Sequence, residues 1–148
     1  WDNGHERLMF ASGSGASHLF EWIVATGEVR QLSSGPESEV DGCYGAAGAI
    51  VWEQPKIAAK PAAGSRIWLR RPGQAPHALT PGPADTEPAC SPDGTRIVYG
   101  SSDPSAGMQL HWIDPELGTG GSLGAGRSAA FSPDGRWIVY AAPTPAGW

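Results

Sequence analysis

Short apolar runs that end in an aromatic side chain recur along this chain. They are Leu8-Met9-Phe10, Ile50-Val51-Trp52, Ile97-Val98-Tyr99 and Ile138-Val139-Tyr140, and successive runs begin 42, 47 and 41 residues apart. Branched aliphatic and aromatic residues favour β-strands. Because consecutive positions are apolar, each run is typical of a strand that is covered on both faces. We therefore predict four equivalent strands, with Trp52, Tyr99 and Tyr140 at equivalent buried positions.

A second pattern lies between these runs and predicts further strands. Leu19-Phe20, Ile67-Trp68 and Leu110-His111 recur at intervals of 48 and 43 residues, and each leads through a turn glycine to a segment that ends in Leu32, Leu79 or Leu123. Two of the apolar runs follow the sequence Ser-Pro-Asp-Gly, at residues 91–94 and 132–135. Asp-Gly favours a type I′ hairpin turn, in which both central residues have positive φ. Each repeat unit is thus predicted to contain four short antiparallel strands.

The distribution of glycine and proline excludes helical architectures. The chain has 148 residues with 21 Gly and 14 Pro, and its longest stretch without either is residues 16–26. Proline breaks helix interiors, so helical bundles and solenoids do not fit this spacing. The longest apolar run, residues 46–52, is far short of the ~20 residues that a membrane-spanning helix needs. Seven Trp and an apolar fraction of 40% argue against disorder.

Four strands per unit and a period of about 41–48 residues are typical of β-propeller blades. We expect an all-β fold in which residues 1–148 form a single propeller segment, with blades at about 1–35, 39–80 and 86–123 and a partial blade at 127–142. This is about three blades' worth of strands, whereas propellers close with ~4 to 8 blades. Either further sequence belongs to the ring, or further copies of the chain complete it.

The repeat resembles that of TolB-type propellers, which also occurs in tricorn-like proteins and in the propellers of prolyl oligopeptidase relatives. The resemblance rests on Ser-Pro-Asp-Gly followed by a basic or polar residue and the apolar run, and on residues 25–32, which are similar to the outer hairpin of that repeat. The family usually has an aromatic residue just before the Ser, and Cys43, Cys90 and Phe131 hold that position here. The resemblance implies a protein-contact module of the cell envelope, which favours a periplasmic or extracellular location.

The two cysteines are predicted to be buried thiols rather than a disulfide. Cys43 and Cys90 are 47 residues apart, at equivalent positions of consecutive blades. Stacked sheets are ~10 Å apart, whereas the Cα atoms of a disulfide are about 4.4–6.8 Å apart. Equivalent positions on neighbouring blades are therefore expected to be too far apart for a bridge.

The histidines and the glycine-rich segments do not indicate a metal or cofactor site. His5, His18, His77 and His111 lack the spacing of a metal-binding helix. Residues 124–129 match G-x-G-x-x-A, but the Ser-Pro-Asp-Gly turn that follows leaves no room for the helix of a dinucleotide site. We therefore expect no cofactor and no metal ion.

No catalytic residue is predicted either. Residues 12–15 lack the spacing and setting of a nucleophile elbow. Asp93 and Asp134 are copies of one turn residue, so we expect Asx-type turn hydrogen bonds from them and not acid–base chemistry. Arg96 and Arg136 follow the same turns and are expected to be solvated or paired with acids of neighbouring loops.

Two segments differ between the repeats and are the candidate binding loops. They are residues 53–65, which hold both lysines of the chain, and residues 101–107. Binding residues often lie on the variable loops of a repeated scaffold. A solvent-exposed loop without a ligand fits the same composition, so the sequence names no binding residue.

The remaining question is the class of function. The formal net charge is −5 and no basic block exceeds two residues, which argues against nucleic acid as a partner. We expect a non-catalytic propeller module that binds a protein or peptide. Two alternatives stay open: the propeller part of a prolyl oligopeptidase-type serine peptidase, whose catalytic domain these residues do not contain, or a propeller lyase or glycan-active enzyme with a site in the central channel.

Overall fold

The structure is a computed structural model that describes residues 1, 2, 4, 6–55 and 64–144. The described residues form 13 strands and one short 3-10 helix, Ala46–Gly48. The strands are β1 Arg7–Ser12, β2 His18–Ile23, β3 Val29–Gln31, β4 Val40–Tyr44, β5 Ile50–Gln54, β6 Arg66–Arg70, β7 His77–Ala78, β8 Asp85–Cys90, β9 Ile97–Asp103, β10 Gly107–Ile113, β11 Gly120–Ala125, β12 Arg127–Phe131 and β13 Ile138–Ala141. The predicted all-β fold is confirmed. Within the described ranges, no helix is long and apolar enough to cross a membrane.

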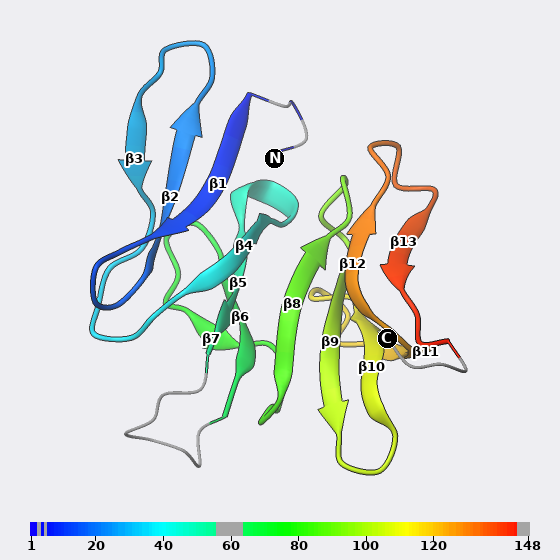
Figure 1. The fold of residues 1–148 in the computed structure, drawn as a ribbon. Helices are drawn as coiled ribbons and strands as arrows, with labels where there is room; N and C mark the ends of the chain where they lie inside the picture. Colours follow the sequence, from blue (N-terminus) through cyan, green and yellow to red (C-terminus); the bar gives the residue numbers. More distant parts are fainter. Residues whose placement is uncertain (3, 5, 56–63, 145–148) are drawn as a thin grey trace.

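The strands form four antiparallel sheets that follow one another in chain order (Figure 1). The first sheet is β1-β2-β3, the second β4-β5-β6-β7, the third β8-β9-β10-β11 and the fourth β12-β13. The leading strands of neighbouring sheets contact each other, β4 against β8 and β8 against β12. Sheets that meander away from adjoining leading strands are the architecture of a partial β-propeller.

The second sheet shows why the apolar runs contain no polar position. Ile50 and Trp52 belong to a core cluster with Met9 of the first sheet, whereas Val51 belongs to a cluster with Ile97 of the third. Successive side chains point to opposite faces of a strand. Positions one and three of the run therefore face the preceding sheet, and position two faces the following sheet. The prediction of a strand covered on both faces is confirmed for β5.

The third position of the first three runs stacks on an aromatic ring of the next strand. The pairs are Phe10–Phe20, Trp52–Trp68 and Tyr99–His111, with ring centroids 5.7, 6.4 and 5.6 Å apart. Cross-strand aromatic pairs of this kind stabilise a sheet by about 0.2–1 kcal/mol each. The sequence analysis listed the same residues as two separate repeats, and the strand pairing brings the two repeats together.

Burial at this third position is not uniform, and the prediction was wrong for one residue. Trp52 is 3% exposed and Tyr99 is partly buried, but Tyr140 is 46% exposed. Among the described residues, β13 pairs with β12 alone. Tyr140 therefore lacks the stacked partner that covers Trp52 and Tyr99.

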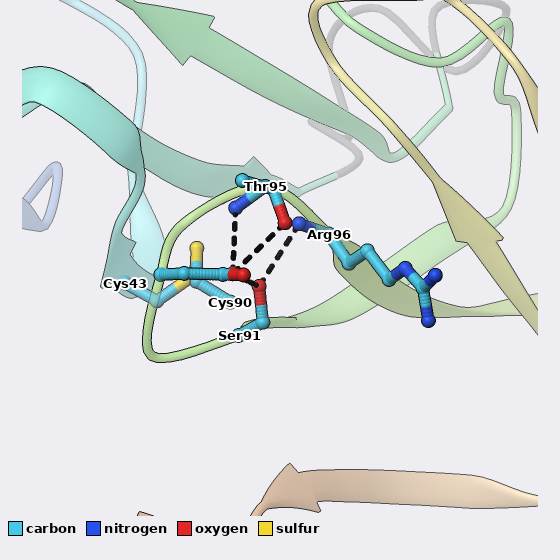
Figure 2. Close-up of a disulfide and its surroundings, with 6 residues drawn as sticks. Cys43, Cys90, Ser91, Thr95 and Arg96 are labelled. Carbon is cyan, nitrogen blue, oxygen red and sulfur yellow. Dashed lines mark hydrogen bonds between the residues drawn. A yellow bond between two sulfur atoms is a disulfide. The ribbon is translucent and has the colours of Figure 1, made fainter. Parts of the chain in front are cut away.

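The Ser-Pro-Asp-Gly turns are not of the predicted type I′. The Gly94 N–H donates to the Ser91 carbonyl at 2.8 Å, and Gly94 has φ +69° while Asp93 is not in the left-handed region. Proline fixes its own φ near −65°, which suits the second position of a type I turn. The Asp93 carboxylate accepts hydrogen bonds from the Ser91 hydroxyl and from the Thr95 N–H and hydroxyl (Figure 2). These contacts confirm Asp93 as a turn-forming residue.

The turn before β5 is one residue shorter than the turn before β9. Tyr44 pairs with Ile50 across five residues, whereas Cys90 pairs with Ile97 across six. A one-residue shift in register moves a side chain to the opposite face of its sheet. Cys43 thus lies opposite Val51 and faces the third sheet, while Cys90 faces the second.

The two cysteines consequently point at each other and form a disulfide (Figure 2). Their Cα atoms are 5.8 Å apart. The prediction of two free thiols was wrong because it treated Cys43 and Cys90 as structurally equivalent, and the shorter turn removes that equivalence. The bridge joins the leading strands β4 and β8, and the neighbouring turns also meet, since the Ala46 N–H donates to the Gly94 carbonyl at 3.3 Å.

The repeat provides a matched test of burial at the second position of the run. Val51 is 0% exposed, whereas its counterpart Val139 is 67% exposed. Truncating Val51 to Ala removes buried methyl groups and leaves a cavity, so it should lower the unfolding free energy by about 2–3 kcal/mol. Val139→Ala should change it by less than about 0.5 kcal/mol. Urea unfolding of dilute protein measures both, and equal losses would contradict the stacking order.

The disulfide makes a second prediction about stability. Replacing both Cys43 and Cys90 by Ser releases a long loop in the unfolded chain and should cost about 2–4 kcal/mol. Reductant should lower the urea midpoint of the wild-type chain by a similar amount and leave the double variant unchanged. Free thiols detected in the unreduced, unfolded protein would contradict the bridge.

Candidate functional site

The three leading strands β4, β8 and β12 each carry a β-bulge at the same place. The bulged pairs are Asp41-Gly42, Glu87-Pro88 and Ser128-Ala129, and they lie opposite Trp52, Tyr99 and Tyr140 respectively. The first residue of each pair has positive φ, 50° for Asp41 and 53° for Glu87 and Ser128. Bulges re-aim side chains and are common next to functional sites. Strained non-glycine residues also concentrate at such sites, so we take these bulges as the candidate site.

The six bulge residues line one open groove of about 420 Å³. The groove runs across β4, β8 and β12, so it belongs to three different sheets. Its carboxylate residues Asp41 and Glu87 occupy equivalent bulge positions, and Ser128 completes the series. We call this surface the bulge groove.

Carboxylates link the bulges from sheet to sheet. Glu53 of β5 accepts a hydrogen bond from the Glu87 N–H at 3.0 Å. Glu87 in turn accepts from the N–H and the hydroxyl of Ser128, at 2.8 and 3.1 Å. A bulge frees a backbone N–H from the strand ladder, and each of these carboxylates satisfies the N–H of the following sheet.

Burial and neighbouring negative charge disfavour the charged forms of Glu53 and Asp41. Burial raises the pKa of Glu53, the bond from the Glu87 N–H opposes this, and the charges of Asp41 and Glu87 raise the pKa further. Glu53 is only 8% exposed. Desolvation and the charge of Glu87 also raise the pKa of Asp41. The Asp41 side chain remains exposed, so Glu53 is the carboxylate that dominates the electrostatics of the site.

A second cavity, of about 360 Å³, lies next to the groove along the same three strands. It is lined by the strand ends and the turns that follow them, together with the N-terminal residues: Trp1, Asp2, Cys43, Tyr44, Cys90, Ser91, Pro92, Ala130, Phe131, Ser132 and Pro133. Trp1 is 61% exposed, so a large aromatic surface is available there. The disulfide forms part of the cavity wall. We call this cavity the mouth cavity.

Tyr44 sits at the mouth cavity in a polar network with the first sheet. The guanidinium of Arg7 lies 5.0 Å from the centroid of its ring, and its hydroxyl donates to Glu21 at 3.3 Å. Burial first, and the charge of Glu21 second, raise the pKa of Tyr44, so the phenol is neutral. The Tyr44 ring is therefore held in place by the first sheet where it lines the cavity.

The sequence analysis did not identify the bulge residues. Asp41, Glu87 and Ser128 are spaced 46 and 41 residues apart, which is the spacing of the other repeats. Because their side chains differ, their spacing was the only sign in the sequence that they occupy equivalent positions. A bulge depends on pairing with the neighbouring strand, and a single strand's sequence does not show it.

The three described histidines lie on different sheets. His18 lies 3.3 Å from the carboxylate of Glu39, His77 is exposed on β7, and His111 stacks on Tyr99. His5 lies outside the described residues. No group of three or more His, Cys, Asp or Glu in the described residues could hold a metal ion.

The cluster around His18 has a structural explanation. Glu39 also accepts from the Ser33 hydroxyl, which itself accepts from the Leu19 N–H. In the second sheet the Thr80 hydroxyl accepts from the Ile67 N–H in the same way. A contact repeated in two sheets points to strand capping instead of catalysis.

The other residues considered in the sequence analysis belong to turns, strands and strand connections. Asp134 accepts from the Ser132 hydroxyl and the Arg136 N–H, as Asp93 does in its own turn. Residues 124–129 join β11 to β12 with no helix, and residues 12–15 form the β1–β2 connection. Arg96 is exposed, as expected for a solvated side chain, and its guanidinium lies 5.7 Å from the centroid of the Trp112 ring.

The two candidate binding loops differ in what the structure describes. Residues 101–107 are the end of the β9–β10 hairpin, with Asp103 accepting from the N–H groups of Ser105 and Ala106. Most of residues 53–65 lies outside the described residues. None of the described residues of the two loops lines the bulge groove or the mouth cavity, and Glu53, the first residue of the 53–65 segment, contacts the groove through the Glu87 N–H.

Comparison with known proteins identifies the fold through solved structures. No protein-family model and no curated protein sequence matches the chain. TolB from Acinetobacter baumannii aligns over 98% of this chain with a TM-score of 0.76 and 19% identity. A putative TolB from Agrobacterium tumefaciens aligns over 95% with a TM-score of 0.71 and 17% identity. The tricorn protease aligns over 93% with a TM-score of 0.57 and 15% identity.

This chain spans only part of each of these proteins: 37% of the Acinetobacter TolB chain, 56% of the Agrobacterium chain and 14% of the tricorn protease chain. At identities below one fifth, the likeness concerns the fold. The sheet order, the paired leading strands and these alignments agree with the resemblance found in the sequence. The chain has a TolB-like β-propeller fold.

Proposed function

We propose that residues 1–148 form one propeller segment that binds a protein or peptide without catalysing a reaction, and that the partner occupies the mouth cavity and the bulge groove. The observation that carries this proposal is that the two spaces lie one after the other along β4, β8 and β12. An extended segment needs such an elongated surface. A small metabolite would need only one of the two spaces.

The mouth cavity has the chemistry of a peptide-anchoring pocket. Its volume of about 360 Å³ lies within the usual range of ~300–1,000 Å³ for ligand pockets. Trp1, Phe131 and two prolines give it apolar walls, and Asp2 and Ser91 are polar residues of its lining. Exposed Trp residues are frequent hot spots of binding interfaces.

The bulge groove favours a partner with positive charge or hydrogen-bond donors. Asp41 and Glu87 line it, Glu53 contacts it through the Glu87 N–H, and burial together with neighbouring negative charge raises the pKa of Asp41 and of Glu53. A Lys or Arg side chain in the groove would relieve this repulsion. We therefore infer a partner segment with an apolar anchor followed by a basic residue.

The likeness to TolB structures and the disulfide both fit a protein-contact module of the cell envelope. Disulfides persist in oxidising compartments such as the periplasm. The propeller part of a peptidase is the second candidate, because the tricorn protease and a structure described as a prolyl endopeptidase share the fold at a TM-score of 0.57. A Gly-x-Ser-x-Gly motif in the same gene would favour that candidate.

A peptide-display selection against the folded chain tests the proposal. Selected peptides should combine an aromatic or aliphatic residue with Lys or Arg. Trp1→Ser should weaken their binding by about 10-fold or more, because Trp1 lines the mouth cavity. Leu117→Ser is the control, since Leu117 is 74% exposed in the β10–β11 turn and lines neither the mouth cavity nor the bulge groove, and it should leave binding unchanged. Titration calorimetry measures both, and equal effects of the two substitutions would contradict the proposed site.

The buried charge of Glu53 predicts a pH-dependent difference in stability. The folded-state pKa of Glu53 is raised above its unfolded value, so its contribution is favourable at low pH and is lost as the pH rises through the folded-state pKa. Glu53→Gln keeps an acceptor for the Glu87 N–H and removes the charge. The variant should therefore be more stable than wild type at pH 7, and this advantage should shrink toward pH 4.

Urea unfolding of the variant and of wild type at several pH values measures the difference between their unfolding free energies. Taking this difference cancels the contributions of all other titrating groups. Glu6→Gln serves as the control, because Glu6 is exposed and should change the unfolding free energy by less than about 0.5 kcal/mol at every pH. The prediction would be wrong if the unfolding free energy of Glu53→Gln relative to wild type were lower at pH 7 than at pH 4. That result would show that the charge of Glu53 is compensated in the folded protein.

A further inference from the structure

A third cavity, of about 370 Å³, lies between the first and second sheets. It is lined by Gln31, Leu32, Ser33, Ser34, Glu39, Trp52, Arg70 and Pro76, none of which lines the mouth cavity or the bulge groove. The two sheets that form it pack on each other through a core cluster that contains Leu19 and Trp52. The cavity is therefore a space within an established contact between neighbouring sheets. We call it the inter-sheet cavity.

Buried residues form part of the lining of the inter-sheet cavity. Trp52 and Ser33 are both buried, so the cavity reaches the core between the two sheets. The indole N–H of Trp52 has no hydrogen-bond partner among the described residues. Buried polar groups are normally hydrogen-bonded. A residue of the lining thus has a donor that the described part of the chain does not use.

Two side chains of opposite charge line the cavity without pairing with each other. The guanidinium of Arg70 donates from Nη2 to the Leu32 carbonyl at 2.7 Å, which holds it at the cavity wall. Glu39 accepts from the Ser33 hydroxyl and lies 3.3 Å from His18, in both cases through Oε2. Within the described ranges, the other donors of Arg70 and the Oε1 atom of Glu39 have no partner. The cavity therefore offers free cationic donors and a free carboxylate oxygen.

The contact between the second and third sheets does not repeat this pair of charges. At the position of Arg70 the third sheet has Ile113, since both residues pair with the first position of an apolar run. At the position of Glu39 the next leading strand has Asp85, which is buried and accepts from the Gly82 N–H at 2.8 Å. Charges that the packing of the repeat required would recur from sheet to sheet. Arg70 and Glu39 are thus a feature of this one cavity.

We propose that the inter-sheet cavity binds a small zwitterion, an α-amino acid or a dipeptide, with its carboxylate on Arg70 and its ammonium group on Glu39. A guanidinium binds a carboxylate through parallel N–H donors, and such charge-assisted hydrogen bonds are strong. Leu32, Pro76 and Trp52 give the cavity an apolar part that suits an apolar side chain of the ligand. The volume lies within the usual range of ~300–1,000 Å³ for ligand pockets. The inference is independent of the proposed peptide-binding function, because the two sites share no lining residue.

Titration calorimetry of the folded chain with L-leucine, L-phenylalanine and glycyl-phenylalanine tests the proposal. At least one of the three should bind with a Kd of about 1 mM or tighter. Binding of the dipeptide alone, or of a free amino acid alone, identifies which of the two zwitterions the cavity takes. The N-acetyl derivative of the bound compound lacks the ammonium group and its amide derivative lacks the carboxylate. Each derivative should bind about 10-fold more weakly or worse, because hydrogen bonds to a charged group are lost.

Substitutions of the two charged residues locate the site. Arg70→Gln and Glu39→Gln should each weaken binding by about 10-fold or more. Arg71→Gln is the matched control, because Arg71 is the next residue along the chain but pairs with Glu116 at 2.6 Å and does not line the cavity. It should leave the affinity unchanged.

Circular dichroism and the urea midpoint establish that each variant is folded. If a variant does not fold, the comparison of the zwitterion with its two derivatives on the wild-type chain decides. Three compounds that all fail to bind at concentrations up to about 10 mM would overturn the proposal. Derivatives that bind as tightly as the zwitterion, or an Arg71→Gln variant that weakens binding as much as Arg70→Gln, would overturn it as well.

Discussion

The burial of β5 between two other sheets is the constraint on which the rest of the structure depends. Ile50 and Trp52 fill one interface and Val51 fills the other, so a single strand contributes to both cores. Such close stacking leaves little room for side chains at the points where strands meet. Gly42 illustrates this, because a Cβ there would overlap the side chain of Met9. The order and spacing of the sheets thus follow from the packing of one apolar strand.

The candidate site is a consequence of this stacking. Leading strands of three sheets come together, and each brings a bulge with a strained first residue. Glu53 and Glu87 reach from their own sheets to satisfy bulge N–H groups of the next. The site therefore depends on the relative positions of the sheets, and a change in their stacking would alter its shape and its charge together.

The disulfide has a similar double role. It closes the gap between β4 and β8, and its residues also line the mouth cavity. A bridge between two leading strands holds the cavity wall in place, and both cysteines also pack against the apolar core cluster that contains Val51 and Ile97. In a module built from stacked sheets, this is an efficient point at which to fix the distance between two sheets.

Local patterns in the sequence determined the strands, their grouping into repeat units and the role of Asp93 in its turn. These features depend on residues close in sequence, such as the alternation of side chains and the fixed φ of proline. The tertiary structure decided which residues meet. A turn shorter by one residue turned Cys43 toward Cys90, the lack of a third described strand beside β12 and β13 left Tyr140 exposed, and strand pairing gathered Asp41, Glu87 and Ser128. Register and neighbouring sheets are set by contacts between distant residues, and no single strand contains that information.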